Sequence, residues 1–163
     1  RLVMIKKILV VLSVTFMSFV ALAKSNIDRE IDKTLNEFHH SAAQADMHSY
    51  FNLLTKDAVF LGTDGKERWT KAEFKAFVEP YFSKGQGWLY SPKERNLTKT
   101  AMADVVIFDE ILENEHYGEC RGSGVVIKTK AGWKIAQYNL SIPIPNLIAK
   151  EVVQDIKKHK TGY

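Results

Sequence analysis

The sequence contains a single cysteine, Cys120, among its 163 residues. A disulfide needs two cysteines, so no intramolecular disulfide can form even in an oxidising compartment. The five histidines show neither HxH nor HExxH spacing, and no second thiol accompanies the cysteine. Zinc sites usually have such patterns, so we expect no metal ion. No glycine-rich phosphate loop joins a predicted strand to a predicted helix, and we expect no cofactor.

Neither sign of charge dominates the chain. It has 23 Lys and Arg residues against 19 Asp and Glu residues, a formal net charge of +4. Residues 1–23 have three basic and no acidic residues, and the tail from Leu147 has four lysines against two acidic residues, so the rest of the chain is nearly neutral. This pattern lacks the basic patch that binds a phosphate backbone, and we expect no nucleic-acid partner.

Only one long hydrophobic run is present, over residues 8–22. Two lysines precede it and an Ala-x-Ala boundary follows it, which is typical of a secretory signal peptide over residues 1–23. A membrane anchor is the alternative, but the run is shorter than the roughly 20 residues that span a bilayer. We therefore expect a periplasmic or secreted protein without membrane association after cleavage. Met4 is the expected start, with residues 1–3 upstream of it.

The remaining sequence changes its hydrophobic period once. Helical spacing predicts three helices before Trp88, and the Asp64-Gly65 pair predicts a hairpin between the second and third. From Trp88 to Ile142 the period is two, which predicts four further strands. This order predicts an α+β domain over residues 24–146, with helices across the concave side of a strongly bent, mostly antiparallel sheet, a cone-like fold. Residues 147–163 are predicted to form an amphipathic helix and tail.

Several segments carry a resemblance to a known family: Phe38-His39 with Ala42-Ala43, Asp57 to Asp64, Glu67 to Thr70, Phe108 to Glu110, Arg121 to Val125, and Trp133 to Ser141. Over roughly residues 27–146 the chain resembles a SnoaL-like domain of the nuclear-transport-factor-2-like superfamily. The resemblance implies the cone-like fold and a homodimer, the common association there. That superfamily includes isomerases, cyclases, dehydratases, epoxide hydrolases and binding modules, so the resemblance implies no single reaction. No catalytic residue is carried over from it.

Strand alternation predicts the polar end of a pocket. Lys128 is taken to mark the outer side of its strand, which places Arg121 on the inner side. Lys134 is taken to do the same on the next strand, which places Gln137 and Asn139 inside. A buried arginine needs a carboxylate, so we expect Asp109 or Glu110 beside Arg121, and alternation leaves open which one. A purely structural ion pair is the alternative interpretation.

Further candidates lie on other elements. Phe60, Trp69 and Trp133 are expected to line the apolar part of the pocket, with Asp64 at its mouth, although Asp64 has an alternative role in the hairpin turn. His39 lies at the edge of the buried stripe of the first helix, where it could serve as an acid or base or remain a core residue.

The sequence thus predicts an exported domain that binds a small apolar or aromatic ligand with one polar end. An acid–base isomerase, dehydratase or cyclase that uses His39 with Asp109 or Glu110 is the first alternative, and whether the chain catalyses a reaction stays open. A dimeric protein-interaction module is the second alternative. Its expected outer face comprises Val126, Ala136, Tyr138 and Leu140.

Overall fold

A computed structural model describes residues 24–160, and the predicted leader lies outside them. Within this range, no helix is both long enough and apolar enough to cross a bilayer. The elements follow one another as α1 (Asn26–Ala43), α2 (Met47–Asn52), β1 (Leu54–Leu61), β2 (Arg68–Thr70), α3 (Lys71–Phe82), β3 (Ser91–Lys99), β4 (Val105–Asn114), β5 (Gly118–Thr129), β6 (Gly132–Ser141) and α4 (Ala149–Lys160). This is the expected order, and it confirms the α+β class.

Local signals set the ends of the helices. At the start of α1, the Ser25 hydroxyl accepts a hydrogen bond from the Asp28 N–H at 3.1 Å, and the Asp28 carboxylate accepts one from the Ser25 N–H. Thr70 and Glu73 form the same reciprocal box at the start of α3. Such boxes satisfy two backbone donors that a helix leaves unpaired, so they fix where each helix begins.

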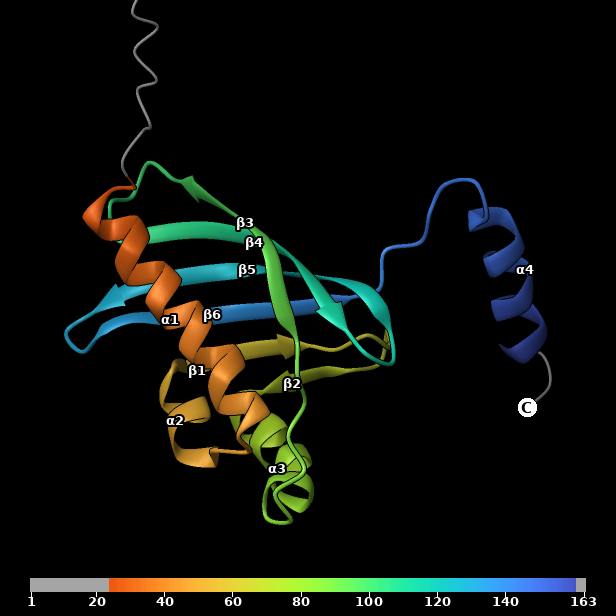
Figure 1. The fold of residues 1–163 in the computed structure, drawn as a ribbon, viewed down its shortest axis with the longest axis horizontal. Coiled ribbons are helices and arrows are strands. Elements are labelled where there is room, and N and C mark those ends of the chain that lie inside the picture. The colour runs from red at the N-terminus through yellow and green to blue at the C-terminus, as the bar shows by residue number, and fades with distance from the viewer. Residues whose placement is uncertain (1–23, 161–163) are drawn as a thin grey trace, which may run out of the picture.

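The strands form one sheet of six in the order β2-β1-β6-β5-β4-β3. The β1–β6 pairing is parallel and the other pairings are antiparallel, so the sheet is mixed and mostly antiparallel. Helix α1 crosses one face of the sheet diagonally, while α2 and α3 lie at the β1–β2 end (Figure 1). The sheet curls around α1 but does not close, because β2 and β3 remain its two edges.

The core fills the space between α1 and the curled sheet. Ile31, Leu35, Phe38 and Ala42 of α1 are buried, as their helical spacing predicts. They pack with buried side chains from every strand except the two edges, together with α2 and α3: Tyr50, Phe51, Leu54, Ala58, Phe60, Phe74, Val78, Phe82, Val106, Phe108, Val126, Trp133, Ile135 and Tyr138.

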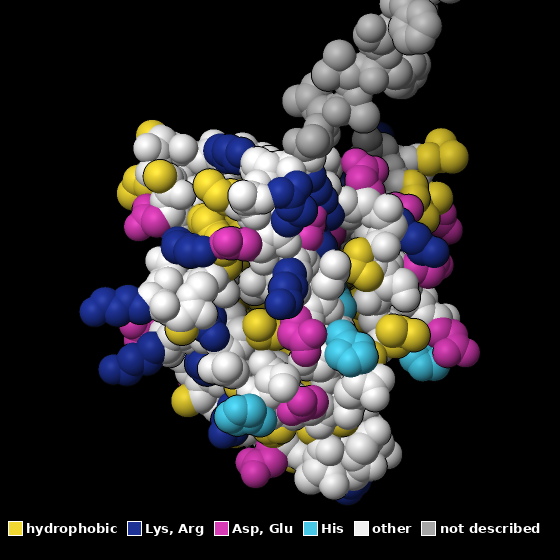
Figure 2. All heavy atoms as spheres, turned by 60° about the vertical axis from the view of Figure 1, so that its left-hand side comes forward, with side chains coloured by type: hydrophobic (Ala, Val, Ile, Leu, Met, Phe, Trp, Pro, Cys, Tyr) yellow, Lys and Arg dark blue, Asp and Glu magenta, His cyan; other side chains and the backbone are white. Residues whose placement is uncertain are grey.

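Helix α4 stands apart from this core (Figure 1). Its side chains are exposed or half-buried, and the segment before it leaves Leu147 95% exposed. On the face shown in Figure 2, acidic and basic side chains are interspersed, so neither sign gathers into a patch there.

Candidate functional site

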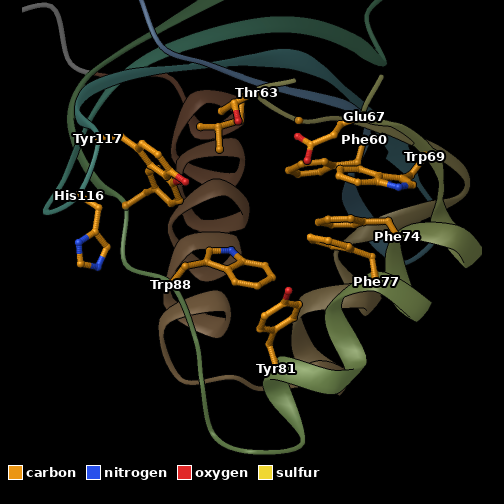
Figure 3. A pocket seen from close by; sticks show the side chains of 13 residues that line it. Phe60, Thr63, Glu67, Trp69, Phe74, Phe77, Tyr81, Trp88, His116 and Tyr117 are labelled. Atoms are coloured by element: carbon orange, nitrogen blue, oxygen red, sulfur yellow. The ribbon is translucent and has the colours of Figure 1, made fainter. Parts of the chain in front are cut away.

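A cavity of about 550 Å³ opens beside the β1–β2 hairpin. Helix α3, the segment that leads into β3, and the turn between β4 and β5 form its other walls (Figure 3). Eight of its described lining residues are aromatic: Phe60, Trp69, Phe74, Phe77, Tyr81, Trp88, Tyr90 and Tyr117. A volume of this size is typical of small-molecule sites, which are mostly apolar with few polar groups.

One wall is a stack of rings from the hairpin and α3. The β1–β2 register places Trp69 opposite Phe60. The Phe60 ring stacks on Phe74 with centroids 3.9 Å apart, and the Trp69 ring stacks on Phe77 with centroids 4.8 Å apart. Phe77 and Tyr81 are 41% and 45% exposed, so the cavity opens to solvent along α3. The rings hold one another in place, so this wall is formed without a ligand.

The opposite wall is fixed by Asn114 at the end of β4. Its amide nitrogen donates to the Leu89 carbonyl at 2.9 Å, and its amide oxygen accepts from the N–H groups of His116 and Tyr117 at 3.0 Å. One side chain therefore holds both the β4–β5 turn and the segment that carries Trp88 and Tyr90. Burial is the main cause that raises the pKa of Tyr90 to about 12, and the nearby Cys120 and Tyr117 add to it. The phenol of Tyr90 therefore keeps its proton at neutral pH.

Glu67 supplies the carboxylate of the cavity. Its Oε2 accepts a hydrogen bond from the Asp64 N–H at 3.1 Å. The carboxylate lies so close to Gly62 that a Cβ at that position would be 2.2 Å from Oε2. Glycine at position 62 thus allows the carboxylate to lie against the hairpin and face the cavity (Figure 3).

Of the residues predicted to line the pocket, Phe60 and Trp69 lie in the cavity wall. Asp64 does not, because its exposed carboxylate accepts from the Lys66 N–H at 2.8 Å within the hairpin turn. Trp133 is also elsewhere: it is buried near Lys128, whose Nζ lies 5.5 Å from the ring centroid. Ligand binding by Phe60 and Trp69 stays a prediction.

The predicted polar end of the pocket is wrong in its orientation. Arg121 is exposed on the outer face of β5, whereas Cys120 and Val126, expected outside, are fully buried. The error arises at Lys128, which lies on the inner side where β5 ends. There its ammonium pairs with Glu30 of α1, so this lysine does not mark the outer face.

Gln137 and Asn139 also face outward, for a different reason. Trp133 and Ile135 point inward as predicted, but the β5–β6 register shifts between Val125 and Val126. A shift of one residue exchanges the two faces of a strand, so the prediction inverts beyond it. The same inversion buries Tyr138 and turns Leu140 into the cavity wall. The expected dimer face is therefore wrong, and a homodimer stays a prediction.

A buried polar network lies behind the aromatic wall. Glu110 is fully buried, and its Oε1 accepts from His39 Nε2 at 2.6 Å and from the Tyr138 hydroxyl at 2.9 Å. Its Oε2 accepts from Arg95 Nε at 2.8 Å. Arg95 also donates to Asn36 of α1 at 2.8 Å. The network therefore joins α1 to three strands of the sheet.

The donors around Glu110 keep it ionised. Burial by itself raises the pKa of this carboxyl, but the hydrogen bond and charge of His39, with the Arg95 guanidinium, lower the pKa below its usual value. Burial and the Glu110 charge raise the pKa of Tyr138, which stays a donor. Because both carboxylate oxygens are already occupied by protein donors, the arrangement is that of a structural anchor. Asp109 faces outward, where it accepts from Asn96 at 3.3 Å.

A family model described as a SnoaL-like domain matches residues 31–145. The chain belongs to this family. Among proteins of curated function, none matches this SnoaL-like domain.

Solved structures support the same fold. An NTF2-like protein from Streptomyces avermitilis, named a candidate dehydratase, is similar with a TM-score of 0.64 and 10% identity, over 76% of this chain and 100% of that one. A ketosteroid isomerase-like protein from Erwinia carotovora is similar with a TM-score of 0.54 and 20% identity, over 72% of this chain and 96% of that one. A candidate scytalone dehydratase from Novosphingobium aromaticivorans is similar with a TM-score of 0.59 and 11% identity, over 71% of this chain and 83% of that one. At these identities the likeness shows the fold alone.

Several site residues of this SnoaL-like domain were not predicted from the sequence. Arg95 lies directly opposite Glu110 in the β3–β4 register, so strand pairing could have identified it as the partner. Glu67, His116 and Tyr117 lie in turns, where side-chain periodicity gives no direction. Within residues 24–160, no group of histidine, cysteine and acidic side chains is arranged to hold a metal ion.

Proposed function

We propose that this SnoaL-like domain binds a small apolar or aromatic molecule with one polar end in the aromatic cavity. The single observation that carries the proposal is a cavity of about 550 Å³ with eight aromatic residues in its described wall. Stacked rings in place before binding reduce the ordering cost for a flat or apolar ligand. The polar end lies toward Glu67 and Thr63, in place of Arg121, Gln137 and Asn139.

Export is part of the proposal and rests on the sequence of residues 1–23. The acid–base alternative receives less support from the geometry. Glu110 has no free oxygen for a substrate, and Asp109 faces away from the cavity. Glu67 and His116, which do reach the cavity, form no hydrogen bond or ion pair with each other in the described part of the chain.

Binding can be tested with N-phenyl-1-naphthylamine, a neutral aromatic dye whose fluorescence rises in apolar surroundings. We expect saturable binding to residues 24–163, and an affinity about fivefold to tenfold weaker in Phe77→Ala, because a ring wall is lost. Phe77 is 41% exposed, so its removal should cost little stability.

Ile107→Ala is the matched control for this variant. Ile107 is a similarly exposed apolar residue, at 47%, but it does not line the cavity. We expect its affinity for the dye to equal that of the wild type. Equal losses in both variants, or no saturable binding to the wild type, would contradict the proposed function.

A further inference from the structure

The cavity has an uneven set of charges. Among its lining residues within 24–160, Glu67 is the one carboxylate, and neither lysine nor arginine is present. Low-dielectric walls around one charge sign concentrate its field, so the cavity attracts positive ligands.

The Glu67 carboxylate is held in position but not neutralised. One oxygen accepts from the Asp64 N–H, and the Gly62 N–H donates to the Glu67 carbonyl at 2.9 Å. Within the described residues Glu67 forms no ion pair, and its Oε1 accepts no hydrogen bond. Half-buried beside the Phe60 ring, it points into the cavity (Figure 3). This leaves one oxygen available to a ligand.

Aromatic side chains face this carboxylate across the cavity. Figure 3 shows Trp88 and Tyr117 on one side and Phe60, Trp69 and Phe77 on the other. The face of an aromatic ring carries negative charge density and attracts a cation within about 6 Å of its centre, with tryptophan the strongest. A desolvated cation between such rings would be attracted both by the ring faces and by the Glu67 carboxylate.

We infer that the polar end of the ligand is a cation, a substituted ammonium attached to an apolar or aromatic body. The ammonium lies between the aromatic walls next to Glu67, and the body lies along the Phe60–Phe74 stack. This inference rests on the proposed function, because it names the ligand class of the same cavity. A quaternary ammonium suits the site, since it needs few hydrogen-bond acceptors and packs its methyl groups against rings.

Two isosteric probes separate charge from shape. The cation 4-(hydroxymethyl)phenyltrimethylammonium and the neutral 4-tert-butylbenzyl alcohol differ only by nitrogen in place of carbon at the branched centre. Each is titrated against bound N-phenyl-1-naphthylamine on residues 24–163. We expect the cation to displace the dye at a concentration at least about tenfold lower than the alcohol does.

Glu67→Gln tests the carboxylate directly. The glutamine carbonyl can still accept from the Asp64 N–H, so the hairpin is preserved, which circular dichroism and thermal unfolding verify. We expect the preference for the cation to fall at least fivefold, with the affinity for the alcohol unchanged. Glu79→Gln is the matched control. Glu79 is an exposed α3 residue that does not line the cavity, and its loss changes net charge equally. We expect it to keep the full preference.

The outcomes distinguish the two proposals. If the alcohol displaces the dye as well as the cation does, the cavity binds ligands but not through a cation. If Glu67→Gln keeps the full preference for the cation, Glu67 is not the group that binds it. In either case the further inference is wrong while the proposed function stands. If neither the dye nor either probe binds, the proposed function itself fails.

Discussion

At Glu110, three donors from three different elements meet on one fully buried carboxylate. Burying a charge costs several kcal/mol unless hydrogen bonds and an opposite charge compensate it. His39, Tyr138 and Arg95 supply that compensation. Gly122 makes room for it, because a Cβ there would lie 2.1 Å from the Tyr138 hydroxyl. The fold thus depends on an ion whose partners are far apart in sequence.

Replacement of Glu110 should therefore destabilise the domain strongly. Glu110→Gln removes the fully buried counter-charge of Arg95 and leaves it only the partly exposed Asp32 carboxylate, 3.2 Å away. We therefore expect the free energy of unfolding to fall by about 3 kcal/mol. Chemical denaturation at pH 7 measures it. Asp109→Asn, which removes the neighbouring outward-facing carboxylate, is the control and should change the free energy of unfolding by less than about 0.5 kcal/mol.

The same pair of variants should differ in pH dependence. The pKa of Glu110 is lower in the folded chain than its ordinary value of 4.5, so below that value the unfolded chain binds the proton first. Stability from this group is complete above pH 5.5 or so and is lost as the pH falls through the folded pKa. We expect wild type and Asp109→Asn to lose stability more steeply from pH 5 to 3 than Glu110→Gln. Equal slopes would show that Glu110 is not held ionised.

At the scale of single elements, the sequence predicts whether a segment is a helix or a strand more accurately than it predicts the direction of its side chains. The α1 stripe is confirmed because four buried residues share one helical period. Alternation predicts which face of a strand is buried only as far as the first bulge, register shift or strand end. On β5, a lysine at the strand end pairs with α1 on the inner side. On β6, a register shift reverses the faces beyond Ile135. Both features depend on neighbouring elements, which a single strand does not encode.

Helix α4 is the element with the least support from the rest of the chain. Its apolar residues Val153 and Ile156 are 46% and 45% exposed, and it stands away from the sheet (Figure 1). Burial, the main stabilising contribution, is therefore nearly absent there. We expect residues 24–146 to unfold within about 2 °C of residues 24–163 in a thermal circular dichroism scan. A fall in Tm of more than about 5 °C would show that α4 packs on the domain in solution.

At the scale of the whole molecule, the curled sheet and its helices enclose a cavity, and the turns contribute Glu67, His116 and Tyr117 to its wall. The α+β class and the SnoaL-like family could be predicted because they depend on element order and on motifs spread along the chain. The polar end of the cavity could not, since Glu67 and Tyr117 lie in turns that only the folded sheet brings together. Phe60 and Trp69 could be placed because they flank a recognisable hairpin.

A crystal structure of residues 24–163 grown with 4-(hydroxymethyl)phenyltrimethylammonium tests the cavity most directly. We expect ordered density for the ligand between Trp88 and Phe77, with its trimethylammonium group beside the Glu67 carboxylate. Density for the ligand on the outer sheet face near Arg121, or a cavity that holds only water at a saturating ligand concentration, would contradict it.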